Sequence, residues 1–338
     1  MLTAELLFLL GWLASLIDSS SLTYQFLGFL IYAIIVAILV SLFVYVVSWF
    51  ERKFIAKVQG RHGPTFVGKY GILQNLADLV KLMAKSHFIP KSADKILFTV
   101  ALPAILGLSI FMIMLIPLFP STGIGEFANN LLLIFALFAF MPLFVFLIGV
   151  ASGNKFGEIS AQRSVIMILS YEIPIFLVIA GVGLLAHSFT ITNIVNGQSK
   201  WYYIVLMPIG FVVMFIAMLA ELERPPFDLR EADSELISGW LTDVSAPYYS
   251  LALFLDYARL FLGTALISIL FLGGWSGPWL SGIVWLLIKM MVLVIFIMII
   301  RATTMRMRID RLLNLGWFVL MPLAILNLIV TYIIYEMI

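Results

Sequence analysis

The stretch YQFLGFLIYAIIVAILVSLFVYVVSWF, from Tyr24 to Phe50, contains no charged residue and ends directly before Glu51-Arg52-Lys53. Its apolar residues do not alternate with polar ones, so the pattern favours an α-helix over a β-strand. A helix needs about 20 such residues to cross a hydrocarbon core of about 30 Å. The stretch therefore predicts a membrane-spanning helix, and similar stretches follow along the whole chain.

The composition indicates that lipid surrounds much of the chain. The 338 residues have a mean hydropathy of +1.13 and only 11% charged residues, whereas a soluble domain carries about 25%. Cysteine is absent, which excludes disulfides, thiolate metal sites and a cysteine-held iron–sulfur cluster in this chain. No basic-region or arginine-rich pattern typical of nucleic-acid binding is present, so we expect no nucleic-acid partner.

Eight apolar runs approach the length of a membrane span. A further run, Leu2–Ile17, is shorter, carries Glu5 and lacks the basic start and cleavage site of a signal peptide; it predicts an interfacial helix or a short ninth span. We expect an all-α polytopic membrane protein, with residues 1–338 as a single membrane domain. The eight runs are 24–50, 97–119, 131–150, 164–186, 201–220, 250–272, 279–300 and 316–335.

Positive charge predicts the orientation of this bundle, because cytoplasmic loops carry an excess of Lys and Arg. Seventeen of the 20 Lys and Arg residues fall in segments 51–96, 151–163, 221–249 and 301–315, whereas the opposite side carries only Lys200. We expect a multi-pass protein of the cell (plasma) membrane, with its large loops 51–96 and 221–249 in the cytoplasm and the ends of the eight-helix core outside.

The loop after the fifth run is acidic. The segment ELERPPFDLREADSELISGWLTDVSAP, from Glu221 to Pro247, holds seven of the 18 acidic residues. Aromatic and apolar residues such as Phe227 and Trp240 are interspersed among these carboxylates, as in a folded or buried segment, and the Pro225-Pro226 pair stiffens its entry. The pattern favours a folded acidic loop over a solvated connector.

A second inner segment predicts an amphipathic helix. Between Ile72 and Met83 the apolar residues share one helical face, while Asp78 and Lys81 lie largely off it. Such a helix lies along the membrane surface or under a partner. The Gly63-Pro64 pair and two further glycines predict a tight loop directly before it.

Four ionisable residues fall within the expected spans and should face the protein interior, because each costs several kcal/mol in lipid. Asp256 and Arg259 share a face at i, i+3 and could simply neutralise one another. Lys289 could be the buried partner of a carboxylate. Glu172, about eight residues into its expected helix and followed by Pro174, has no partner in its own turn; it is the best single candidate for a proton relay.

The basic stretch RATTMRMRIDRL, from Arg301 to Leu312, follows the seventh run. Its first interpretation is orientation and contact with lipid headgroups. A docking surface for an acidic partner is the second interpretation.

Several motifs, in order, resemble a known family. ERKFIAKVQGRHGPTFVGKYGILQNLADLVKL, which starts at Glu51, and ELERPPFDLREADSEL, which starts at Glu221, are similar to two signatures of the H subunit of respiratory complex I. SYEIP, FLGGW and RAT…R…DRLLNLGW are shorter matches. The resemblance covers nearly all of the chain from Tyr24 onward. This family also includes the matching membrane subunits of energy-converting hydrogenases and their sulfur-reducing relatives.

The resemblance implies a role for the acidic loop. In this family the loop folds against a peripheral redox arm, closes a cavity below an iron–sulfur subunit and leads to buried carboxylates that begin a proton path. On that basis the path comprises Glu172, Glu221, Glu223 and Asp256, and we add Lys289. The residues implied at the cavity and coupling loop are Glu51, Arg52, Arg61, Asp78, Arg224, Phe227, Asp228, Glu231, Asp233, Glu235 and Asp243.

The resemblance also implies partners and cofactors. We expect peripheral iron–sulfur and nickel–iron-hydrogenase-like subunits, antiporter-like and small membrane subunits, and lipid. No catalytic residue, metal or cofactor is expected in this chain alone; the iron–sulfur clusters belong to neighbouring subunits, and a quinone is a candidate substrate. The chain is then a non-redox subunit of an oxidoreductase complex.

Four departures from the family pattern bear on the electron acceptor. Ala139 stands where complex I members commonly have a glutamate on the third helix. Asp256 and Asp243 replace glutamates, and Arg230 replaces a proline. These departures favour the hydrogenase-like or sulfur-reducing branch, which uses no quinone, over a quinone-reducing complex of the NADH or F420 type.

Two hypotheses from other classes are weaker. A stand-alone transporter often shows two similar halves with paired broken helices, and no such repeat is visible. A purely structural membrane anchor has little reason to place Glu172, Asp256 and Lys289 inside the membrane. The favoured function is therefore anchoring and coupling in a redox-driven ion pump.

Overall fold

The computed structural model describes residues 22–117, 129–230 and 233–337, and every regular element within them is a helix. Seven helical stretches are long and apolar enough to cross a membrane, and α10 (Pro208–Glu221) is a shorter apolar helix. The predicted all-α polytopic membrane fold is therefore confirmed. The expected helix at Leu2–Ile17 lies outside the described residues.

The seven long stretches include two that are interrupted. They are α2 (Leu22–Val58), α4 (Lys95–Met114), α5 (Asn130–Phe138) with α6 (Met141–Ala151), α7 (Lys155–Ala186), α12 (Ala246–Phe271), α13 (Gly282–Thr303), and α14 (Ile309–Asn314) continued by a π-helical turn (Leu315–Leu320) and α15 (Met321–Met337). The connections contain α3 (Gln74–Met83), α8 (Ile191–Gly197), α9 (Tyr203–Leu206), α11 (Asp233–Leu236) and 3₁₀ turns at Lys69–Gly71 and Gly239–Leu241.

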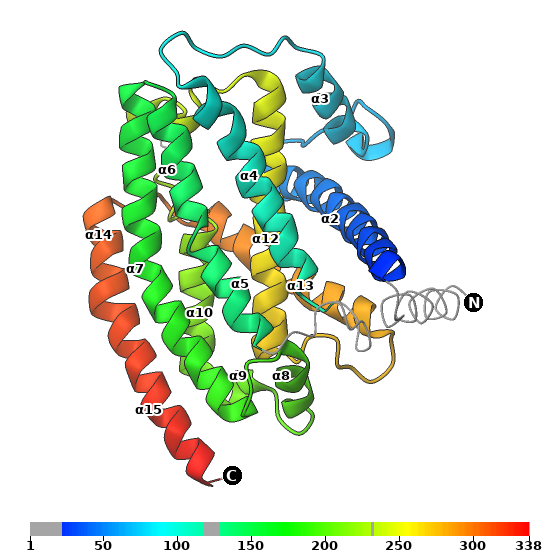
Figure 1. The fold of residues 1–338 in the computed structure, drawn as a ribbon, viewed down its shortest axis with the longest axis vertical. Coiled ribbons are helices and arrows are strands. Elements are labelled where there is room, and N and C mark those ends of the chain that lie inside the picture. Colours follow the sequence, from blue (N-terminus) through cyan, green and yellow to red (C-terminus); the bar gives the residue numbers. More distant parts are fainter. Residues whose placement is uncertain (1–21, 118–128, 231–232, 338) are drawn as a thin grey trace.

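Helix α12 lies at the centre of the bundle and is the most buried of the long spans. It contacts α2, α4, α10 and α13, while α7 packs against α6, α10 and α15. Figure 1 shows α4, α7, α12 and α15 running roughly along the long axis, with α2 oblique to them on one side. The connection that carries α3 covers the end of the molecule where α12 begins.

Several predicted span boundaries were wrong. Helix α2 continues past residue 50 to Val58, so Glu51 and Arg52 lie on a helix and not in a loop. Helix α7 begins at Lys155, capped by the Asn154 side chain, which accepts from the Phe156 amide. Glu172 is therefore near the middle of its helix. The helix starts nine residues before the apolar run, in a polar segment. Hydropathy alone does not reveal this polar first part of the helix.

Two other predicted spans are divided. The run 131–150 forms α5 and α6, with a break at Ala139 and Phe140. The run 201–220 forms α9 and α10, and the chain leaves helical geometry at Met207 directly before Pro208. Proline cannot donate the amide hydrogen bond that would continue the preceding helix.

The predicted amphipathic helix is confirmed as α3. Its polar residues face α2: the Asn75 amide donates to Ser48 Oγ at 2.5 Å, and Asp78 accepts from Arg52 at 2.6 Å. Apolar residues on the other side, including Leu76 and Met83, are exposed in this chain. The polar contacts therefore fix α3 at the end of α2, with its apolar face directed outward.

Close packing of α6 against α7 depends on small residues. A Cβ at Gly149 would lie 2.4 Å from Ala161 Cβ and 2.6 Å from the Gly157 carbonyl oxygen. Membrane helices commonly approach one another through such small residues.

We predict that Gly149→Ala destabilises the protein by about 1–3 kcal/mol, because the added methyl group forces the two helices apart. Gly107→Ala is the matched control, since nothing lies within 4 Å of that Cβ in α4 and alanine favours helix formation. The measurement is the thermal unfolding midpoint of the full-length chain in detergent. Equal midpoints for the two variants would contradict the packing argument.

Candidate functional site

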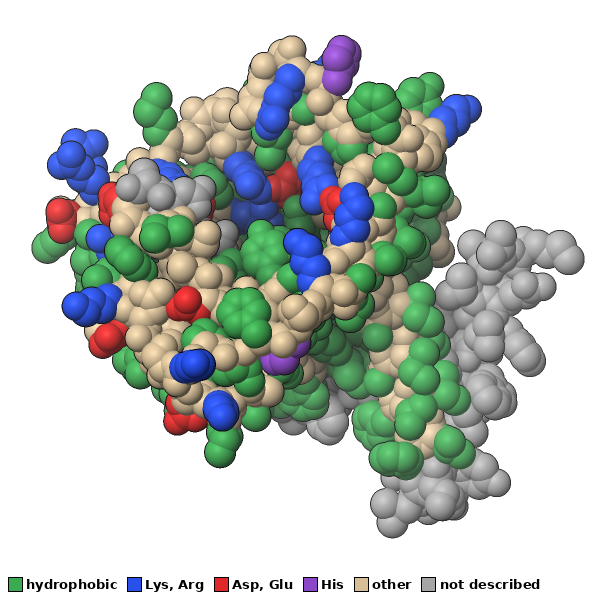
Figure 2. Space-filling model, turned by 90° about the horizontal axis from the view of Figure 1, so that it is seen from above, with side chains coloured by type: hydrophobic (Ala, Val, Ile, Leu, Met, Phe, Trp, Pro, Cys, Tyr) green, Lys and Arg blue, Asp and Glu red, His purple; other side chains and the backbone are tan. Residues whose placement is uncertain are grey.

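A cavity of about 780 Å³ opens where α2 and α13 end. Its wall combines residues from the end of α2 and the loop behind it with Pro225, Tyr257 and the segment that follows α13. Figure 2 shows Lys and Arg side chains gathered around a hollow on this face of the molecule. Arg52, Arg61, Arg301, Arg306 and His62 contribute to the lining, so most of the charge around the cavity is positive.

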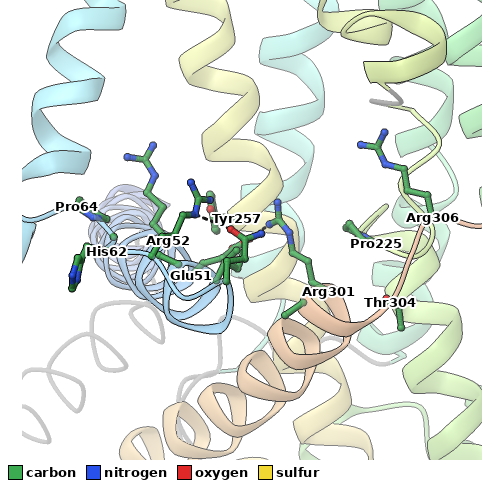
Figure 3. A pocket seen from close by; sticks show the side chains of 15 residues that line it. Glu51, Arg52, His62, Pro64, Pro225, Tyr257, Arg301, Thr304 and Arg306 are labelled. Carbon is green, nitrogen blue, oxygen red and sulfur yellow. Dashed lines mark hydrogen bonds and ion pairs between the residues drawn. The ribbon is translucent and has the colours of Figure 1, made fainter.

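Glu51 joins three parts of the chain at this cavity. Its carboxylate accepts a hydrogen bond from Arg224 at 2.9 Å and forms a second ion pair with Arg301. Figure 3 shows Glu51 of α2 and Arg301 of α13 facing one another. The Arg224 guanidinium also lies 5.0 Å from the centre of the Tyr257 ring. Glu51 is 3% exposed, so its negative charge needs both guanidinium groups.

Two of the arginines that line the cavity pair with acidic residues outside it. Arg52 donates to Asp78 of α3, and Arg306 donates to Asp228 at 2.8 Å. Burial tends to raise the pKa of Asp78, but hydrogen bonds from Arg52 and Gln74 outweigh this effect and hold the pKa below its ordinary value. These pairs connect the cavity lining to α3 and to the acidic loop.

Behind this cavity lies a buried cluster of carboxylates and guanidinium groups. Glu223 pairs with Arg230 at 2.5 Å and with Arg259 at 3.1 Å, and it accepts a hydrogen bond from Ser164. Burial alone would raise the pKa of Glu223. The Arg230 and Arg259 charges, with the Ser164 hydrogen bond, hold it below its ordinary value instead.

The same two arginines connect this cluster to further acids. Arg259 donates to the Glu221 carbonyl oxygen at 2.5 Å and lies 3.7 Å from its carboxylate. Arg230 donates to Asp256 at 3.1 Å. The mutual neutralisation of Asp256 and Arg259 considered from the sequence is therefore wrong. Each has a partner from the acidic loop or the end of α10, which i, i+3 spacing could not indicate.

The cavity and the buried cluster share a wall. Glu223 pairs within the cluster, while the next residue, Arg224, pairs with Glu51 at the cavity. A positive φ of 50° at Glu223 accompanies this change of direction. Likewise Asp256 contacts Arg230, while its neighbour Tyr257 lines the cavity. Two pairs of adjacent residues thus link the two compartments across one layer of backbone.

Glu172 borders this cluster, whereas Lys289 lies apart from it. The Glu172 charge acts on Glu221, and its Oε1 is buried without a hydrogen-bond partner among the described residues. Lys289 Nζ donates to the carbonyl oxygens of Leu272, Gly274 and Ser276 at 2.6–2.8 Å. Among the residues that the structure describes, these carbonyl oxygens, and not a carboxylate, are the hydrogen-bond partners of Lys289. The first of these partners, Leu272, follows Arg259 by 13 residues along and just past α12. At a rise of 1.5 Å per residue, Lys289 therefore binds about 20 Å from Arg259.

The other predicted loop residues have diverse surroundings. Phe227 is buried against Tyr171, with ring centres 5.4 Å apart. Glu235 forms an exposed pair with Arg163, and Asp243 accepts from the Asn154 side chain at 2.7 Å. Glu231 lies outside the described residues, and the side chain of Asp233 is not among those described.

Sequence reasoning missed several lining residues. Arg301 and Arg306 belong to the stretch that we assigned to orientation, lipid or docking, whereas their side chains line the cavity. His62 and Tyr257 were not singled out. The RAT…R motif was a signal for the two arginines, but only the fold shows that they meet Glu51 and Asp228.

Comparison with known proteins places this chain in a family. A family model described as NADH dehydrogenase matches residues 4–332. The H subunit of NADH-quinone oxidoreductase from Geobacillus sp. (strain WCH70) is 41% identical over 295 residues, covering 85% of this chain and 88% of the relative. The H subunit from Bacillus cytotoxicus is 38% identical over 330 residues, covering 95% and 98% of the two chains.

A third relative, the H subunit numbered 2 of NADH-quinone oxidoreductase from Syntrophobacter fumaroxidans, is 36% identical over 307 residues, covering 88% of this chain and 92% of the relative. The family model covers most of the membrane bundle and every residue that lines the cavity. The chain therefore belongs to the family of NADH-quinone oxidoreductase H subunits, whose members are membrane subunits of complex I.

Proposed function

We propose that this protein anchors and couples a complex I-like redox-driven ion pump, linking electron transfer in a peripheral iron–sulfur arm to proton translocation. The observation that carries the proposal is the shared wall between the cavity and the buried carboxylates. A charge that changes in the cavity acts on Arg224 and Tyr257. Their neighbours Glu223 and Asp256 lie inside the cluster.

The composition of the cluster suits proton exchange. Glu172, Glu221, Glu223 and Asp256 supply more carboxyl groups than two arginines can neutralise. Burying excess negative charge is costly, so the cluster should hold protons and share them between its members. A nearby change of charge would then shift these protons, which is the physical basis of coupling.

The remaining assignments follow from this role. The cavity faces the cytoplasmic side of the cell membrane, where segments 51–96 and 221–249 dock the peripheral arm. Iron–sulfur clusters are held by neighbouring subunits, and antiporter-like and small membrane subunits continue the ion path. Lys289 remains a predicted member of this path, at its far end.

The names of the relatives favour a quinone as electron acceptor, since they describe NADH-quinone oxidoreductases. The cavity supports this function, because its volume of about 780 Å³ lies within the range of about 300–1,000 Å³ for small-molecule pockets. Ile55 and Tyr257 offer apolar surface, while Arg52 and His62 offer hydrogen-bond donors to a quinone carbonyl.

The second candidate is a quinone-free, hydrogenase-like or sulfur-reducing complex. The observation that favours it is the absence of an acid at Ala139, where the resemblance leads us to expect a glutamate. Its partners would include a nickel–iron-hydrogenase-like protein in the peripheral arm.

Glu172→Gln tests the coupling role. In the complete complex reconstituted into vesicles, proton translocation should fall at least about tenfold, because the amide cannot carry a proton. Glu158→Gln, at an exposed position near the start of the same helix, is the matched control and should translocate protons like the parent. Full translocation in an assembled Glu172→Gln complex would refute the proposed relay.

Ile55→Trp tests the quinone assignment. The larger side chain should obstruct the cavity and lower kcat/KM for a short-chain quinone at least about tenfold, the scale of one misfit group in a pocket. Ile38→Trp, on an exposed apolar face of α2, is the control and should retain parental kinetics. If the purified complex instead reduces protons or sulfur compounds and does not reduce quinone, the second candidate replaces the first.

A further inference from the structure

Ser160 of α7 joins two distant points of the acidic loop. Its hydroxyl donates to the Arg230 carbonyl oxygen at 2.7 Å and accepts from the Trp240 amide at 3.2 Å. Ser160 is fully buried. One buried side chain therefore forms hydrogen bonds with the backbone of two loop residues that lie ten positions apart.

The loop is shaped to close on Ser160. Gly239 adopts a φ of +56°, and a Cβ there would lie 2.0 Å from the Arg230 carbonyl oxygen and 2.6 Å from Ser160 Oγ. Only glycine permits this close approach. The Arg230 guanidinium carbon lies 4.9 Å from the centre of the ring of the following residue, Trp240. Ser160 therefore contacts the backbone of Arg230, and Trp240 contacts its side chain.

The position of Arg230 matters because its guanidinium reaches two carboxylates. It contacts Glu223 at 2.5 Å and Asp256 at 3.1 Å. Ser164, one turn after Ser160 on α7, donates to the same Glu223. Two serines on one face of α7 thus act on the cluster, one directly and one through the Arg230 backbone.

We propose that Ser160 is a positioning residue for the proton path: it fixes the main chain of Arg230, so that the guanidinium stays between Glu223 and Asp256. This inference rests on the proposed coupling function. It adds that Ser160 influences the pH at which the buried carboxylates of the cluster take up protons. The described partners of Ser160 are backbone groups, so its proposed role is to position Arg230 and not to carry protons.

The direction of the expected pH effect follows from the groups around Glu223. Arg230 and Arg259 stabilise its ionised form, Ser164 donates to it, and Glu221 lies beside it on Arg259. Glu172 acts on Glu221, and Asp256 shares Arg230. If Arg230 moves away, Arg259 and Ser164 are the groups left, among the described residues, that oppose the effect of burial on Glu223. Glu223 then takes up a proton at higher pH.

The first measurement is the pH profile of proton-coupled turnover in the reconstituted complex. Ser160→Ala should shift the acid limb upward by roughly one pH unit, because a neighbouring opposite charge lowers a carboxyl pKa by about 1–3 units. Ser109→Ala is the matched control: Ser109 is equally buried, but its hydroxyl donates to Ile105 within its own helix. Its profile should match the parent.

A double-variant comparison separates positioning from general structural support. Arg230→Gln should produce an upward shift similar to that of Ser160→Ala, and the combination should add no further shift, because both changes act on one interaction. Additive shifts, or a Ser160→Ala profile that matches the parent, would overturn the inference. Failure of Ser160→Ala to assemble while Arg230→Gln assembles would also overturn it, since Ser160 would then serve folding.

Infrared titration of protonated carboxyl groups in the same complexes tests the positioning role of Ser160 separately from the coupling function. If Glu172→Gln abolishes translocation but Ser160→Ala leaves the carboxyl titration unchanged, the coupling function stands and the Ser160 role is wrong. If Glu172→Gln translocates normally, the coupling function fails. A Ser160-dependent carboxyl shift would then still identify the positioning of Arg230.

Discussion

The burial of Glu223 between Arg230 and Arg259 is the constraint on which the site depends. Removing a charge from water costs several kcal/mol per ion, and only close, well-oriented partners offset that cost. The partners here come from the acidic loop and α12, while Ser164 of α7 supplies a further hydrogen bond. Three elements that are distant along the chain are therefore held in one arrangement around a single carboxylate.

This arrangement gives the apolar bundle two different compartments at one end. The cavity carries mostly positive side chains, with Glu51 paired to arginines from the acidic loop and α13. The buried cluster contains more acids than bases. Because one layer of backbone separates them, charge in one compartment acts on the other over a short distance and through a medium of low dielectric constant. On the proposed function, electrostatic coupling between the two compartments would require no large movement of the helices.

The sequence predicted the helices more reliably than the contacts between their side chains. Long apolar runs identified every described span, because lipid demands both hydrophobicity and internal backbone hydrogen bonds. Helix ends were less predictable: α2 and α7 extend through polar residues such as Arg52 and Lys155. Local spacing also misled, since it suggested that Asp256 pairs with Arg259. Both residues instead bind partners outside α12, which spacing along one helix cannot reveal.

The alternation between Glu223 and Arg224 also constrains how this family member can change in evolution. One residue faces the cluster and the next faces the cavity, and Asp256 and Tyr257 repeat this division on α12. Inserting or deleting a single residue just before Glu223 would shift the register of this segment by one position. A residue of the wrong charge would then face each compartment. The length of this segment should therefore tolerate less variation than the identity of many residues within it.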